Sequence, residues 1–450
     1  QGTMAPGPAS GRGNGMSNSL TDDLYAKLVN EEDARVCREI PESACREVPG
    51  NFFLLIGSYV LTKLGDALAN PKTTLTWMMD AVGAPVALTG LLVPVRESGS
   101  LIPQLAIAAF VRKQAVRKWV WVLGSLLQSA AVLTMGILAW SVGGVVAGAG
   151  IVAALVAFSL ARGLCSVASK DVLGKTIPKT RRGRVNGISA GLAGIATLAV
   201  GAALVASGAD DGAPLTFLVL LGSAAALWVA AAGLYSRITE EPGETEGGGN
   251  ALNEALGKLR LLRDEPPFRN FVITRALLLC SALSAPYYVL LARRHDSGAV
   301  GQLGFFIIAG GLASSLSAPF WGRLADWSSR RVMVIAALMT SGLGFLAVAI
   351  EITAQGIAAS TWFYPGVFFV LLVAHCGVRL GRKTYVVDLA SGNRRTDYVA
   401  VSNSVIGGLL LLLGSVGALA QALSVTAVVF VLSVLGLAGA LMGWFLDEVT

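Results

Sequence analysis

The sequence predicts an all-α protein that crosses a membrane twelve times, as two pseudo-symmetric bundles of six helices each. Three observations support this fold class. Of the residues, 54% are hydrophobic and only 14% are charged, whereas an ordinary soluble domain has about 25% charged residues. The apolar residues form long blocks, each near the roughly 20 residues that a helix needs to span a bilayer. A pattern of basic loops also recurs in both halves of the chain.

The apolar blocks, taken in order along the chain, predict twelve spans separated by polar loops. Glycine, alanine and serine recur inside the blocks, and such small residues allow close helix contact in a membrane. A packed bundle is therefore favoured over isolated membrane anchors. The expected spans cover residues 51–70, 83–110, 119–140, 145–170, 186–207, 214–236, 269–292, 301–323, 331–352, 363–383, 398–421 and 425–446.

One long polar stretch interrupts the body of the chain, at residues 237–268 between the sixth and seventh expected spans. It contains a run rich in glutamate and glycine and is typical of a linker between two domains. The sequence thus predicts a polar N-terminal tail at 1–48, a first six-helix bundle at 49–236 and a second at 269–450.

Lysine and arginine gather in the loops on one side of the predicted bundle. Because basic loops stay in the cytoplasm, we expect both termini and the linker to be cytoplasmic, in a bacterial inner membrane. This bias accounts for the net charge of +7, so no nucleic-acid partner is needed to explain it. The basic side carries Arg112, Lys113, Arg117, Lys118, Lys175, Lys179, Arg181, Arg182, Arg184, Arg323, Arg330, Arg331, Arg382, Lys383, Arg394 and Arg395, and the other side carries mainly Lys72, Arg293 and Arg294.

The basic loops also indicate an internal repeat. A shift of 213 residues carries Arg181 onto Arg394, and the same shift carries Arg117 onto Arg330. Two separate loops therefore agree on one register. Parallel repeats of this kind are typical of transporters whose central site opens alternately to either side of the membrane.

A loop between the eighth and ninth expected spans has the sequence Gly322-Arg-Leu-Ala-Asp326-Trp-Ser-Ser-Arg330-Arg331. It resembles the signature loop of the Major Facilitator Superfamily, which has a glycine, three residues, an aspartate and a following basic pair. The equivalent loop of the first half keeps the basic pair but has Lys113 in place of the acid. The resemblance extends to span count, linker position and repeat, so it covers nearly the whole chain.

The resemblance implies a gating role for this loop. In the superfamily, its acid contacts the ends of neighbouring helices and helps to hold the outward-open state. We therefore expect Gly322, Asp326, Arg330 and Arg331 to act in gating, the alternative being that they are solvated loop charges. Drug and proton antiporters of the superfamily carry a Gly-Pro element in the fifth span. This sequence lacks it there, so multidrug efflux is disfavoured.

Ionisable residues inside the expected spans are candidates for a functional site, because a charge at membrane depth is costly unless it has a partner or a wet cavity. By resemblance, the first, fourth, seventh and tenth helices line the cavity. Basic groups outnumber acids among these residues, which favours an anionic substrate. The residues expected to bind it are Lys63, Arg96, Arg162, Arg275, His375 and Arg379.

Proton coupling needs a group whose pKa can lie near neutrality, and burial can bring a carboxyl pKa there. Asp66 and Glu97 are expected to fill this role, and His375 is a third candidate. Asp66 is the first choice because it shares a helix face with Lys63. A substrate anion that competes for Lys63 would leave the Asp66 carboxylate unpaired and favour its protonation. The alternative is that Lys63 with Asp66, and Arg96 with Glu97, are structural ion pairs.

The sequence thus predicts a secondary active transporter that moves a small organic anion by alternating access, coupled to protons, as a monomer among membrane lipids. It has no Ser/His/Asp triad, ATP-binding phosphate loop or metal-ligand spacing, so we expect no enzyme activity, cofactor or metal. Two alternatives stay open. A lipid or lysolipid flippase would have a lateral cleft with an apolar floor and basic groups near Arg96 and residues 112–118 for headgroups. A non-transporting assembly factor or receptor would have an occluded core.

Overall fold

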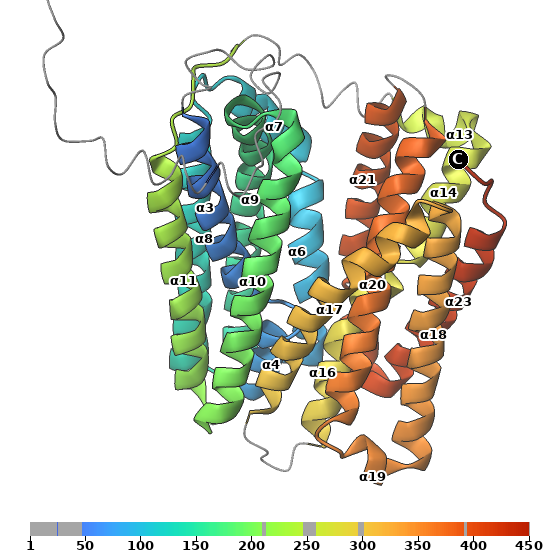
Figure 1. Ribbon diagram of the computed structural model, residues 1–450. Helices are drawn as coiled ribbons and strands as arrows, with labels where there is room; N and C mark the ends of the chain where they lie inside the picture. Colours follow the sequence, from blue (N-terminus) through green and yellow to red (C-terminus); the bar gives the residue numbers. More distant parts are fainter. Residues whose placement is uncertain are drawn as a thin grey trace, which may run out of the picture.

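The computed structural model describes residues 25, 47–208, 213–245, 258–295, 301–390 and 394–449. Within them every regular element is a helix. The helices form two bundles side by side, one from each half of the chain (Figure 1). This arrangement confirms the predicted all-α class. Most of the predicted tail, with Cys37 and Cys45, and the middle of the predicted linker lie outside the described residues.

Ten helices or helix runs in the described part of the chain are long and apolar enough to cross a membrane. Each overlaps one of the spans predicted from hydropathy. They are α8 (Lys118–Ser141), α9 (Gly144–Thr176), α10 (Lys179–Ser207), α11 (Pro214–Ser236), the run from α14 to α16 (Pro266–Arg294), α17 (Gln302–Ala325), α18 (Ser329–Thr353), α20 (Phe363–Leu389), the run from within α21 to the end of α22 (Asp397–Ala422), and α23 (Val425–Trp444).

The remaining elements are shorter. The two runs consist of α14 (Pro266–Leu277), α15 (Cys280–Leu283) and α16 (Ala285–Arg294), and of α21 (Arg394–Leu413) and α22 (Val416–Ala422). Before α14 lie a 3-10 turn (Lys258–Arg260) and α13 (Leu261–Asp264), and α19 (Gln355–Ala358) precedes α20. The first two predicted spans form α3 (Val48–Leu68), α4 (Thr74–Ala81), α5 (Val86–Thr89), α6 (Leu92–Leu101) and α7 (Gln104–Arg112).

The break between α3 and α4 follows from Pro71, which has no N–H to donate and disfavours helical backbone at Asn70. Side chains satisfy the freed backbone groups. Asn70 Oδ1 accepts from the Lys72 N–H at 2.8 Å, and the Thr76 hydroxyl donates to the Pro71 carbonyl at 2.7 Å. The first span therefore consists of two helices, α3 and α4, and extends to Ala81, past its predicted end at residue 70. Lys72, expected in a loop on the less basic side, lies instead in this break, near charges of α6 and α20.

The two halves repeat one packing pattern. In the first bundle, α8 packs against α9 and α11, and in the second, α18 packs against α20 and α23. These are the third, fourth and sixth spans of each half. The basic loops gather at the end of the molecule where α7 ends and α8 and α10 begin, which we call the basic face; it is at the top of Figure 1. The ends of α4 and α16 mark the opposite face.

The two bundles meet at the opposite face. One apolar cluster there contains residues of both bundles, including Trp77 of α4 and Phe306 of α17, whose ring centroids lie 6.0 Å apart. Arg293 Nε of α16 lies 2.9 Å from Asp80 Oδ2 of α4 across the same junction. Toward the basic face the apolar clusters of the two bundles are separate. The bundles therefore diverge toward the basic face, as Figure 1 shows.

Glycines allow the bundles to touch backbone to backbone. A Cβ at Gly90, which follows α5, would lie 2.4 Å from the Cα of Gly417 on α22. A Cβ at Gly304 on α17 would lie 2.7 Å from the carbonyl oxygen of Gly201 on α10. Neither position has room for a side chain, so these glycines set how closely the two bundles approach.

Candidate functional site

Three charged side chains meet in the interior of the first bundle. Asp66 of α3 pairs through Oδ2 with Arg162 of α9 at 2.5 Å, and through Oδ1 with Arg96 of α6 at 3.4 Å. The side chains are between 18% and 29% exposed, so solvent screens these ion pairs only in part. Arg96 also lies over the Phe158 ring, 5.0 Å from its centroid. One carboxylate thus joins three helices.

Lys63 lies one helical turn before Asp66 but makes no ion pair with it within 4.0 Å in the described structure. It interacts with Asp66 and Arg162 only at longer range. The predicted Lys63–Asp66 ion pair is therefore wrong, because a guanidinium occupies each oxygen of the carboxylate. We call Lys63, Asp66, Arg96 and Arg162 the Asp66 group.

Glu97, the next residue after Arg96 on α6, faces a different set of charges. Lys72 from the α3–α4 break and Arg379 and Arg382 of α20 act on it electrostatically. Arg96, the partner of Glu97 in the alternative of a structural ion pair, also acts on it electrostatically, together with these cations from two other segments. Lys72 and Glu97 belong to the first bundle and the two arginines to the second. We call these four residues the interbundle group.

Two further residues predicted to bind substrate contact neighbouring helices. His375 Nδ1 of α20 lies 3.1 Å from the hydroxyl of Ser281 on α15. Arg275 of α14 is 7% exposed and donates hydrogen bonds to the Ser402 hydroxyl and, at 2.8 Å, to Asn403 Oδ1. Arg275 therefore holds α14 against α21, apart from the Asp66 group. Its predicted role in substrate binding stays a prediction.

A cavity of about 650 Å³ lies between the bundles near the basic face. On one side it is bounded by α6, α7 and α9, and on the other by α21. Lys170 of α9 lines it and follows Arg162 by eight residues, which places both on one face of that helix. That face therefore leads from the cavity toward the Asp66 group. The cavity is lined by Leu101, Gln104, Ala108, Val111, Arg112, Arg117, Val167, Lys170, Asp171, Val399, Ala400, Asn403 and Ser404.

The loop predicted to act in gating is held by the C-terminal segment. Arg330 pairs with Glu448 Oε2 at 2.6 Å and donates to the carbonyl oxygens of Trp444 and Leu446 at 3.1 and 2.9 Å. Glu448 also accepts a hydrogen bond from the Ser328 hydroxyl. Arg330 and Glu448 thus join the start of α18 to the segment after α23.

The other residues predicted to act in gating make fewer contacts. Asp326 is exposed, and its side chain makes no hydrogen bond or ion pair with the residues described. The Arg331 guanidinium lies over the Trp327 ring at 4.1 Å, and nothing lies within 4 Å of a Cβ built at Gly322. An unbound Asp326 is what we expect if this acid holds a state in which the basic face is closed.

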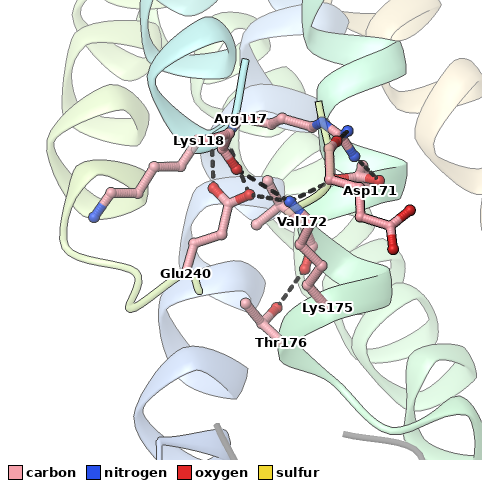
Figure 2. Close-up of polar contacts among 9 residues, drawn as sticks. Arg117, Lys118, Asp171, Val172, Lys175, Thr176 and Glu240 are labelled. Atoms are coloured by element: carbon pink, nitrogen blue, oxygen red, sulfur yellow. Dashed lines mark hydrogen bonds and ion pairs between the residues drawn. The ribbon is translucent and has the colours of Figure 1, made fainter. Parts of the chain in front are cut away.

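A second acid, Glu240, holds the equivalent loop of the first bundle (Figure 2). Its carboxylate accepts from the backbone N–H groups of Arg117 at 3.1 Å and Lys118 at 2.6 Å, and from Lys175 Nζ at 3.0 Å. Arg117 and Lys175 also pair with Asp171 of α9. Glu240 therefore caps the start of α8, where a negative charge is favourable.

Sequence reasoning missed both Glu240 and Glu448. Lys113 stands where the superfamily has its loop acid, and Glu240 supplies a carboxylate to that loop from outside it. Their shared position in the two halves could have indicated them. Each glutamate is the fourth residue after the last helix of its half, which ends at Ser236 in α11 and at Trp444 in α23.

The arrangement as a whole is suited to binding an anion. The Asp66 and interbundle groups together contain six basic side chains and two carboxylates. Guanidinium groups bind carboxylate and phosphate through paired hydrogen bonds. No cluster of three His, Cys, Asp or Glu side chains that could hold a metal ion occurs among the described residues.

The sequence matches no known protein family and no curated protein. Its fold, however, is similar to several solved structures. A mutant of the nucleoside transporter NupG has a TM-score of 0.69 at 12% identity, covering 87% of this chain and 99% of that one. A POT family transporter in complex with a thioalcohol conjugated peptide has 0.66 at 12%, covering 90% and 98%. A D-xylose-proton symporter has 0.65 at 13%, covering 88% and 97%.

Identities this low show the fold alone. The chain has the fold of Major Facilitator Superfamily transporters along most of its length, and with its apolar helices it is an integral, multi-pass membrane protein. The resemblance inferred from the signature loop is thereby confirmed for the fold.

Proposed function

We propose that this chain, which has the Major Facilitator Superfamily fold, is a secondary active transporter for a small anionic organic solute. The carrying observation is the Asp66 group: a carboxylate held by arginines from two other helices, on a helix face that leads to a cavity between the bundles. The three similar structures are described as a nucleoside transporter, a peptide-bound transporter and a sugar–proton symporter, which supports a transport function.

The basic face is proposed to be the cytoplasmic face, because basic loops stay inside. The protein would then lie in a bacterial inner membrane, as a monomer surrounded by lipid, with the present structure open toward the cytoplasm. The Asp80–Arg293 ion pair and the contact of Trp77 with Phe306 would close the outer side. Alternating access would separate these contacts while the basic face closes.

Asp66 is proposed to carry the coupled proton. A substrate anion that takes Arg96 or Arg162 as its partner would leave the carboxylate with less compensation, and protonation would then be favoured. Substrate and proton would each favour the binding of the other, which is symport. This mechanism keeps the predicted role of Asp66 but assigns the competing cations to the two arginines and not to Lys63. Glu97 is the second candidate for this role.

Proteoliposomes with imposed pH and voltage gradients test this proposal. A metabolite panel identifies a transported solute, and Asp66→Asn is then compared with wild-type protein. We expect the variant to lose uphill uptake but to keep exchange at equal concentrations. Asp264→Asn, at an exposed position on α13, is the control and should keep both. A folded Asp66→Asn protein that still concentrates the solute contradicts the coupling role.

A lipid or lysolipid flippase is the second candidate, and the lining of the cavity between the bundles supports it. The cavity has apolar walls at Leu101, Val167 and Val399 and basic groups at Arg112 and Lys170, which suits a headgroup beside an acyl chain. Translocation of a fluorescent lysolipid between leaflets, measured by quenching, tests this function. The cavity argues against the third alternative, an occluded assembly factor or receptor.

A further inference from the structure

Four basic side chains between the bundles have no acidic side chain within ion-pair distance in the described structure. Lys72, Arg379 and Arg382 belong to the interbundle group, and Lys383 follows on α20. Within the described structure, none of the four makes a side-chain hydrogen bond or an ion pair within 4.0 Å. Glu97 is a carboxylate that acts electrostatically on all four. Three positive charges are therefore left uncompensated on this side of the site.

The Asp66 group is also short of negative charge. Its carboxylate already faces Arg96 and Arg162, while Lys63 has no direct partner in the described structure. Cations held inside a membrane protein without partners are costly. Each group is thus suited to one anionic group of a ligand, and their arginines lie on different helices, Arg96 and Arg162 on α6 and α9 and the other two on α20.

The unpaired cations extend toward the cavity entrance. Arg379 and Lys383 are spaced by four residues on α20, about 6 Å along one helix face. Lys383 lies within electrostatic range of Lys170, which lines the cavity from the first bundle. The shift of 213 residues that relates the two halves carries Lys170 onto Lys383. An anion that enters from the basic face therefore meets equivalent lysines from both bundles.

We propose that the solute is a small organic dianion with two separate anionic groups, such as a dicarboxylate. One group binds Arg96 and Arg162 in place of Asp66, and the other binds Arg379 and Arg382. This inference rests on the proposed transport function and specifies its substrate class. A monoanion complements one group of cations at a time, whereas a dianion complements both. Because it then connects the two bundles, it favours closure of the cavity around itself.

Malonate, succinate and glutarate, each compared with its monoamide, test this inference because each pair differs by one charge and little in size. Binding to the purified full-length protein is measured by calorimetry. We expect at least one dicarboxylate to bind about tenfold or more tightly than its monoamide, as for one lost charge-assisted contact. Arg379→Gln should lower the affinity for that dicarboxylate by a similar factor and leave the affinity for its monoamide nearly unchanged. Equal affinities within every pair, or no binding of any dicarboxylate, would overturn the inference.

Controls separate charge, folding and geometry. Arg263→Gln removes one positive charge at an exposed position on α13 and should leave both affinities unchanged. Where Arg379→Gln does not fold, Arg379→Lys keeps the charge but not the planar fork, and a smaller selective loss is expected. Glycerol 3-phosphate carries both charges on one group. Tighter binding of this compound than of every dicarboxylate would contradict a ligand whose two anionic groups bind the two groups of cations.

Transport separates this inference from the proposed function. Proteoliposomes that take up a monoamide as well as its dicarboxylate would overturn the dianion inference and leave the transport function in place. Binding of a dicarboxylate with the expected selectivity, but without uptake of any solute in the panel, would support the binding site and contradict transport.

Discussion

Glu240 and Glu448 occupy equivalent positions in the two halves, each four residues beyond the last helix of its bundle. Glu240 binds the backbone at Arg117, and Glu448 binds the side chain of Arg330. The repeat of 213 residues carries Arg117 onto Arg330. In each bundle, an acid just after the last helix therefore binds the start of the third span at the basic face. The burial of the two acids differs, since the Glu240 side chain is 0% and the Glu448 side chain 34% exposed.

We expect Glu240→Gln to destabilise the protein more than Glu448→Gln does. The buried Glu240 carboxylate accepts three charge-assisted or helix-capping hydrogen bonds, so its loss should cost about 1.5–3 kcal/mol. The more exposed Glu448 ion pair should contribute less than about 1 kcal/mol. Chemical denaturation in detergent micelles measures both. Glu241→Gln, at an exposed neighbouring position, should have no effect, and equal losses for Glu240→Gln and Glu241→Gln would contradict the assignment.

Charge reversal at Asp326 should shift the conformational equilibrium toward the present state, open at the basic face. Asp326 is exposed and has no side-chain partner among the described residues, so Asp326→Lys should leave the stability of this state intact. Loss of a contact in the other state should change the ratio of states about fivefold, as for about 1 kcal/mol.

Spin labels at Lys179 and Arg323, which are exposed on α10 and α17 of different bundles, report this equilibrium through electron–electron distances. Asp264→Lys is the charge control on α13. Distance distributions that do not differ between Asp326→Lys and wild-type protein would argue that the loop acid has no gating role.

A methyl group at Gly90 should separate the bundles at the opposite face. Its Cβ would lie 2.4 Å from the Gly417 Cα and 3.0 Å from the Tyr287 hydroxyl. Overpacking of this kind costs about 1–3 kcal/mol, so Gly90→Ala should reduce the population closed at that face. Labels near the ends of α4 and α16 measure it. Gly187→Ala on α10, where nothing lies within 4 Å of the added Cβ, should be silent, and a similar shift in both variants would contradict the packing argument.

Two serines on α21 provide a matched test of the cavity. Ser404 lines it, whereas Ser402 is 0% exposed and bonded to Arg275. In a background without the native cysteines, Ser404→Cys should react with a water-soluble thiol reagent added at the basic face. Ser402→Cys should react more than about tenfold more slowly, because a buried thiol reacts only when the structure opens locally. Equal rates would mean that α21 does not form this wall.

The sequence alone determined the membrane fold and its repeat. Hydropathy over about 20 residues and the distribution of lysine and arginine are properties of contiguous segments, so they predict spans and the basic face without knowledge of packing. The same reasoning identified Asp66, Arg96 and Arg162 as buried charges, because a charged residue within an apolar block can be recognised from the sequence alone. It did not predict that the first span would break at Pro71, continue as α4 and bring Lys72 inside.

Only the tertiary structure decided which charges meet. Asp66 is one turn from Lys63 along α3, yet its partners are Arg96 and Arg162, because ion pairing depends on how neighbouring helices are rotated and how far they slide along one another. The link between Glu240 and the start of α8 likewise spans more than a hundred residues. Such contacts arise where separate segments pack, and the pattern within any one segment does not contain them.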